Sequence, residues 1–181
     1  MAQAVTLAPR RCGEWYVSET RCGPMVHAAL DIGAENSVKL VSLVRSKSEQ
    51  LAREQDLPFV LVDGSPGIGC PVIASLTGAD AALLVAEPSV SALHDLERVV
   101  RLLAHFKIPA RVLLNKCDLS PDLARRIHEY CRQENLPVVG EIPLSPVFVQ
   151  AQLQGRTAAE MNPHGLGRDL ARIWAQLAQI P

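Results

Sequence analysis

The strongest constraint on the fold is a regular alternation of short apolar runs with amphipathic segments, which begins at residue 58. The apolar runs are rich in Val and Leu and do not alternate with polar residues. Such runs are typical of strands buried on both faces, as in a parallel sheet. Strands and helices that alternate in this way form βαβ units with right-handed crossovers. We therefore expect an α/β fold, a three-layer sandwich with a mainly parallel sheet, whose strands lie at residues 58–63, 80–87, 110–116 and 136–143.

Helical patterns fill the intervals between these runs. Residues 91–106 place Leu and Val side chains on one face, and Ser91 is the expected N-cap. Another helix is expected to begin with Ser120 as its cap and Pro121 at its first helical position. Further elements are expected at residues 23–32 (a strand), 37–55 (a helix) and 165–180 (a helix that turns Leu170, Ile173, Trp174 and Leu177 inward).

The composition excludes several classes of protein. The 181 residues have the length of one domain, and 48% apolar with 20% charged residues is ordinary for a globular chain. A net charge of −1 and an aromatic content of 4% argue against a nucleic-acid-binding protein. No apolar run has the length of a membrane span or of a signal peptide. The chain is therefore expected to have no nucleic-acid partner and no membrane span.

The five cysteines are odd in number, widely spaced and without a Cys-x-x-Cys pair. They indicate reduced thiols in a cytoplasmic protein. No spacing of Cys or His matches a metal site, so we expect no metal bound by these residues.

Asp63 ends the first apolar run and is followed by the turn sequence Gly-Ser-Pro-Gly. In α/β sheets ligands bind beyond the carboxyl ends of the strands. One interpretation is that Asp63 holds Mg²⁺ through water while the Gly67 amide lies near a γ-phosphate. The other is a turn without a ligand, because Asp, Gly, Ser and Pro are all favoured turn residues. The residues alone leave both open.

The motif Asn-Lys-Cys-Asp, residues 115–118, follows a later strand. Asn115 is a candidate to bond a nucleotide base through its amide, and Asp118 resembles a guanine reader. A polar turn that leads into the Ser120 cap explains Asp118 equally well. Glu87 and Pro88, at another strand end, are either a switch element or a strand stop.

A phosphate-binding loop of the type Gly-x4-Gly-Lys-Ser/Thr requires a Gly-Lys step. The sequence contains no such step, and the nearest candidate, Ser37-Val38-Lys39-Leu40, has valine in place of the glycine.

Several blocks together resemble a known family. "VLVDGSPGIGCPVIASLTGADAALLVAEPS", "ALHDLERV", "LLNKCDL" and "GEIPLSP" are similar to successive blocks of the MinD/ParA-type (CobQ/CobB/MinD/ParA nucleotide-binding domain) P-loop ATPases. The similar branch carries an inserted ferredoxin segment. The resemblance covers about residues 9–161 and implies the C-terminal portion of such an ATPase, without the phosphate loop and the iron–sulfur insert. In the family the cysteines that ligate the iron–sulfur clusters lie in the insert. Cys12 and Cys22 fall after the position of that insert and do not correspond to these ligands.

The resemblance also implies roles for individual residues. Asp63 matches the Walker-B-type aspartate, Gly67 the switch-II glycine, Asn115 the base-contacting asparagine, and Pro143 a proline beside the base pocket. Lys39 falls in a block of the family whose glycine is Val38 here, and Ala92 replaces another family glycine. ATP or ADP with Mg²⁺ is the ligand that the resemblance implies for the complete protein, and no iron–sulfur cluster is expected in this chain.

These observations favour a partial P-loop ATPase that does not hydrolyse ATP alone, because the phosphate loop supplies most of the catalysis. The alternatives are a non-enzymatic interaction or dimerisation module and, less favoured, a GTPase. Without the phosphate-loop strand, the strand that ends at Asp63 and its neighbour are expected to have unpaired backbone and bare apolar side chains. The chain is therefore expected to self-associate, to bind a separate N-terminal half, or to cover the gap with its own residues 1–30.

Overall fold

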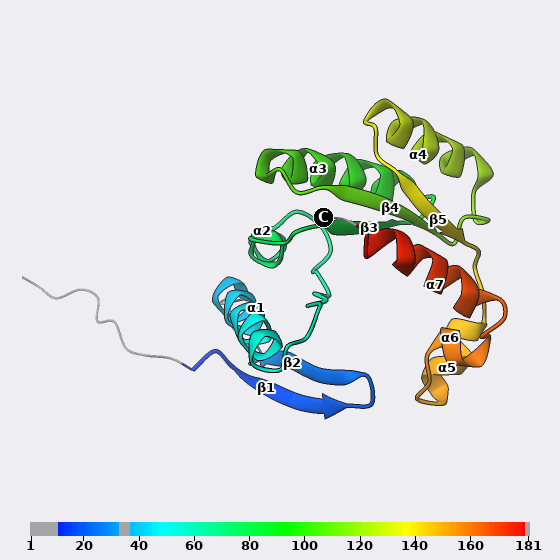
Figure 1. Ribbon diagram of the computed structural model, residues 1–181. Coiled ribbons are helices and arrows are strands. Elements are labelled where there is room, and N and C mark those ends of the chain that lie inside the picture. Colours follow the sequence, from blue (N-terminus) through cyan, green and yellow to red (C-terminus); the bar gives the residue numbers. More distant parts are fainter. Residues whose placement is uncertain (1–10, 33–36, 180–181) are drawn as a thin grey trace, which may run out of the picture. The chain divides into compact units, whose positions relative to one another are not determined.

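The computed structural model describes residues 11–32 and 37–179 (Figure 1). The chain divides into two compact units, Met1–Thr77 and Gly78–Pro181, and each is described by itself. The expectation that residues 1–181 form a single domain stays a prediction. Residues 1–10, part of the segment expected to cover the gap, lie outside the described residues.

The first unit combines an antiparallel hairpin with two helices. Strand β1 (Gly13–Thr20) pairs with β2 (Gly23–Leu30), and helices α1 (Ser37–Glu54) and α2 (Cys70–Leu76) follow. The expected strand within residues 23–32 and the expected helix at 37–55 are confirmed. Strand β1 was not expected from the sequence, because its polar residues interrupt the apolar pattern.

Residues 58–63 do not form the expected strand, so this prediction is wrong. Their backbone belongs to neither sheet. The side chain of Phe59 is 55% exposed and that of Leu61 is 85% exposed. A strand exists only where a neighbouring strand accepts and donates its ladder hydrogen bonds, and no described strand takes that place. The expectation that the apolar side chains of this segment are bare agrees with the exposure of residues 59–62.

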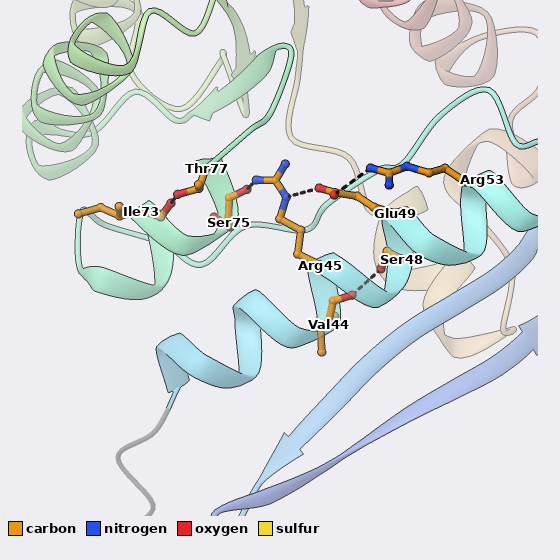
Figure 2. A network of polar contacts seen from close by, with 8 residues as sticks. All are labelled: Val44, Arg45, Ser48, Glu49, Arg53, Ile73, Ser75 and Thr77. Carbon is orange, nitrogen blue, oxygen red and sulfur yellow. Dashed lines mark hydrogen bonds and ion pairs between the residues drawn. The ribbon is translucent and has the colours of Figure 1, made fainter.

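A polar network joins α1 to α2 (Figure 2). The guanidinium of the buried Arg45 donates to the carbonyl oxygen of Ser75 at 3.0 Å and to Glu49 at 3.1 Å. The Ser75 hydroxyl, also buried, donates to the carbonyl of Val72 at 2.8 Å. Because buried polar groups are stable only when they are hydrogen-bonded, this network fixes the short helix α2 on the longer α1.

The second unit is a three-layer α/β structure, as expected. Its parallel sheet has the order β3 (Ala82–Ala86), β4 (Ala110–Asn115), β5 (Val138–Ile142). All three strands fall within the expected runs. The connecting helices are α3 (Val90–Phe106) and α4 (Pro121–Gln133), and the chain closes with α5 (Val147–Leu153), α6 (Ala158–Met161) and α7 (Leu166–Leu177).

Each face of this sheet has its own apolar core. On one face Val112 and Leu114 of β4 pack against residues of α3 and α4, among them Leu96 and Ile127. On the other face Leu113 packs in the cluster that contains Ile173 of α7. The alternation of side chains along β4 supplies both cores, which explains why its run is apolar throughout.

Two details of the helices differ from expectation. The N-cap of α3 is Ser89 and not Ser91, since the Ser89 hydroxyl accepts the Ala92 amide at 3.1 Å. Helix α3 therefore begins two residues earlier than the sequence pattern indicates. Trp174 of α7 is 43% exposed rather than inward, because it lies about 100° around the helix from Ile173.

A substitution at Gly140 of β5 tests the contact between this strand and α7. A Cβ atom at this position would lie 2.7 Å from the Cδ1 and Cγ1 atoms of Ile173. We predict that Gly140→Ala lowers the free energy of unfolding by about 1–3 kcal/mol through overpacking, measured by urea denaturation. The double variant Gly140→Ala/Ile173→Val is expected to lose less than the sum of the two single changes. Full additivity would contradict this contact.

Candidate functional site

The carboxyl ends of β4 and β5 bring two of the predicted site residues together. Asn115 is the last residue of β4 and stands opposite Ile142 in the parallel register. Pro143 follows Ile142 directly. The side chain of Asn115 is half-buried and Pro143 is exposed. Both residues therefore lie at one edge of the sheet, where α/β proteins bind their ligands.

The Asn115 side chain is oriented by its own loop. Its Oδ1 atom accepts the backbone amide of Lys116 at 3.1 Å, which leaves the NH₂ group to donate to a ligand. Lys116 has a φ of 52°, in the left-handed region. The Lys116 ammonium forms an ion pair with Glu87 at 3.0 Å, and this pair links the ends of β3 and β4.

Asp118 has a structural partner. Its Oδ1 atom accepts the backbone amide of Leu144 at 2.7 Å, and the Cys117 amide donates to the carbonyl of Ile142 at 3.1 Å. Ser120 begins α4 as expected, but its side chain makes no capping hydrogen bond. The carboxylate of Asp118 thus ties the loop after β4 to the loop after β5, which accounts for it without a guanine ligand.

The other two predicted residues belong to the first unit. Asp63 is exposed and opens a turn that ends at Gly69, the N-cap of α2. Gly67 has a φ of 83°, a conformation that favours glycine, and no atom lies within 4 Å of the position a Cβ would take. Backbone geometry therefore requires Gly67 here whether or not a phosphate binds. The structure places Asp63 and Gly67 in one loop, separate from the unit that carries Asn115.

The two residues that stand where the similar family has glycine both lie in helices. Val38 is in the first turn of α1, and Ala92 is in the first turn of α3. Both backbones are helical, so a side chain is compatible with each position. Lys39 is exposed and lines a shallow depression of about 160 Å³ between the hairpin and α1, together with Cys12.

The described residues contain no group of three or more acidic, His or Cys side chains able to hold a metal ion. Magnesium in nucleotide sites is bound by one or two carboxylates plus phosphates and water. A single carboxylate such as that of Asp63 is compatible with this mode of binding.

Sequence reasoning missed the pair Lys116–Glu87 and the bond from Leu144 to Asp118. Both join residues that follow different strands, so their contact depends on the strand order. The visible signal was that Glu87 and Lys116 directly follow strands and that Asp118 comes three residues after the end of β4. In the part of the chain that the structure describes, no helix is both long and apolar enough to cross a membrane.

Three solved structures resemble the chain. A chain of the MinC:MinD cell division protein complex of Aquifex aeolicus matches with a TM-score of 0.67 and 19% identity, over 89% of this chain and 66% of that one. The cell division ATPase MinD of Pyrococcus furiosus gives 0.64 and 20%, over 84% and 64%. MinD of Pyrococcus horikoshii, complexed with Mg-ADP, gives 0.61 and 20%, over 83% and 61%. The chain therefore has a MinD-like P-loop NTPase fold.

Two curated relatives come from Methanocaldococcus jannaschii. The uncharacterized protein MJ0578 is 28% identical over 102 residues, which are 56% of this chain and 36% of that protein. The uncharacterized protein MJ0579 is 22% identical over 141 residues, 72% of this chain and 51% of that protein. The chain thus spans about a third to a half of the length of these relatives. No family model matches the chain.

The thiol of Cys117 reports on the loop after β4. Burial raises its pKa above the ordinary value, and the nearby carboxylates of Glu141 and Asp118 raise it further. Less thiolate is then present at a given pH, so we predict slower alkylation by iodoacetamide at pH 8 than for the exposed Cys22 and Cys70. Mass spectrometry of each peptide measures the rates.

The matched variant is Asp118→Asn, which keeps an oxygen for the Leu144 amide and removes the charge. Because one source of the raised pKa is lost, alkylation of Cys117 is expected to accelerate in this variant. Equal rates at Cys117 and Cys22 in the parent chain would refute the prediction.

Proposed function

We propose that the chain is the nucleotide-binding part of a MinD/ParA-like ATPase, with the base of ATP or ADP bound between Asn115 and Pro143. The observation that carries this proposal is the position of both residues at the carboxyl ends of neighbouring parallel strands in a MinD-like fold. The free NH₂ group of Asn115 donates to a ring nitrogen of the base. The Lys116–Glu87 ion pair holds the Asn115 loop in place.

In this proposal Asp63 holds Mg²⁺ through water and the Gly67 amide faces the γ-phosphate. The support is the loop geometry: the acid and the glycine are close in sequence, and the turn leads into α2. The hydrogen bonds of Arg45 then support the proposed Mg²⁺ site indirectly (Figure 2). They fix α2, and α2 fixes the end of the loop that carries Asp63.

In this proposal the chain does not hydrolyse ATP by itself, because its sequence has no Gly-Lys dipeptide from which a phosphate-binding loop could be built. A separate N-terminal half, or self-association, would supply what the chain lacks. The resemblance to the ferredoxin-bearing branch supports a link to iron–sulfur proteins, although no cluster is proposed in this chain. MinD of Aquifex aeolicus is solved in complex with MinC, and a protein partner is proposed here on the same ground.

A second candidate function is a non-enzymatic interaction or dimerisation module. The observation that favours it is the run of exposed apolar side chains at residues 59–62. Exposed apolar runs mark interaction surfaces in many proteins. A nucleotide-binding measurement distinguishes the two candidate functions, because an interaction module does not require Asn115 to contact a base.

We predict that ATP or ADP with Mg²⁺ raises the melting temperature of the chain and that GTP raises it less. A ligand at about one hundred times its Kd adds about 2.7 kcal/mol to the free energy of unfolding. Asn115→Ala is expected to remove the shift. Asn135→Ala, an exposed asparagine at the end of α4, is the matched control and is expected to keep it. No shift with any nucleotide in the parent chain would favour the interaction module.

A second prediction concerns catalysis. The purified chain is expected to release phosphate from ATP no faster than a buffer blank in a coupled assay with Mg²⁺. Steady turnover that co-purifies with the chain and disappears in Asp63→Ala would show that the chain contains a complete catalytic site.

A further inference from the structure

An open groove of about 610 Å³ follows the outer edge of β5 in the second unit. It is lined by residues 138–141 of β5, by His128 of α4 and by Arg172 and Gln176 of α7 (Figure 1). Strand β5 is the last strand of its sheet, and no described strand pairs with this edge. All of the lining residues belong to the second unit.

Two successive outward positions of β5 present backbone groups to this groove. The register with β4 passes over Val139, which is a bulge, so this residue has no opposite residue in β4. The carbonyl of Ile142 accepts the Cys117 amide at 3.1 Å and so points toward the β4 side. Because the backbone groups of successive strand residues point to opposite sides, the amide and carbonyl of Glu141 point away from β4. These are the groups with which a further strand would pair.

The carbonyl of Val139 is bonded by a side chain and not by a strand. The amide of Gln176 donates to it at 3.4 Å, which is longer than the ~2.9 Å of an ordinary N–H···O bond. A side-chain amide offers the same donor as a backbone amide. An incoming strand can therefore replace Gln176 at this acceptor without leaving the carbonyl unsatisfied.

The two sides of the groove carry opposite charges. On the α4 side the Oε1 atom of Glu141 lies 2.8 Å from His128 Nε2, and the Glu141 side chain is 50% exposed. On the α7 side the Arg172 side chain is 66% exposed, and its contact with Asp169 is long, at 3.5 Å. A ligand that covers these groups must supply the opposite charges, because a buried charge without a counter-charge is costly.

We propose that this groove binds an extended peptide segment of a partner protein, which pairs with β5 as an additional strand. The backbone of the segment exchanges hydrogen bonds with Glu141 and replaces Gln176 at the carbonyl of Val139. Side chains alternate between the two faces of a sheet, so neighbouring residues of the segment face the two sides of the groove. The segment has a basic residue that faces Glu141 and, next to it, an acidic residue that faces Arg172.

An extended charged segment suits this groove better than a compact molecule or an apolar strand. The open backbone groups follow one another along β5, which is the arrangement that a strand bonds. An apolar strand would cover Glu141 and Arg172 without a counter-charge. The segment contacts neither Asn115 nor Asp63, so the inference goes beyond the proposed nucleotide binding and does not rest on it.

NMR of the isotopically labelled full chain, titrated with a synthetic peptide, tests this inference. The probe is the capped peptide Thr-Val-Lys-Glu-Val-Thr, in which neighbouring lysine and glutamate supply the two charges. Saturable shifts are expected at the backbone amides of residues 139–141 and at the side-chain NH₂ group of Gln176.

A charge reversal at Arg172 tests which charge the α7 side selects. Arg172→Glu is expected to weaken binding of this peptide about three- to fivefold. The same variant is expected to bind the capped peptide Thr-Val-Lys-Lys-Val-Thr more tightly than the parent chain does, a rescue that a misfolded variant could not show. Arg126→Glu, at an exposed arginine of α4 outside the groove, is the matched control and is expected to leave both affinities unchanged.

Three results would overturn the inference: no shift with the peptide, shifts confined to other surfaces, or equal binding by the parent chain and Arg172→Glu. Shifts of the groove amides that grow with protein concentration before any peptide is added would identify a second copy of the chain as the occupant, and would overturn it as well. None of these results bears on Asn115, which the nucleotide measurements test separately.

Discussion

A parallel strand is stable only beside another strand and between two covered faces, and the second unit depends on this requirement. Strand β4 meets it fully: β3 and β5 flank it, and Val112, Leu113 and Leu114 are all buried in the two cores. Once β4 is fixed in this way, the ends of the neighbouring strands are fixed with it. The loops that carry Asn115, Lys116 and Pro143 therefore start from defined positions.

The same requirement explains how much of the fold was predictable. The sequence predicted β3, β4 and β5 because strands buried on both faces have a continuous apolar pattern, and it predicted α3 and α4 from their apolar faces. It also predicted a strand at residues 58–63 from the same pattern, which was wrong, because the pattern reports the burial that a segment needs and not whether a partner exists. Helices α5 and α6 are too short for a visible period, and β1 has too many polar residues.

The candidate site was predictable in part. The strand pattern suggested Asn115 and the family resemblance suggested Pro143, and the parallel register brings both to one edge, while their role in binding stays a proposal. The ties that hold them, from Glu87 to Lys116 and from Leu144 to Asp118, join residues far apart in the chain and became visible only with the strand order. Only Asn115 serves two purposes in the proposal, because its Oδ1 atom accepts the Lys116 amide while its NH₂ group would contact the nucleotide. The roles of Asp63 and Gly67 remain proposals.

The central claim is that a nucleotide base binds at the carboxyl ends of β4 and β5. The most direct measurement is a titration of the isotopically labelled chain with Mg-ATP, followed by NMR of the backbone amides and the asparagine side-chain NH₂ groups. The account predicts saturable shifts at the Asn115 NH₂ group, at Lys116 and at Leu144. Shifts that avoid these residues, or a spectrum that does not change, would contradict it.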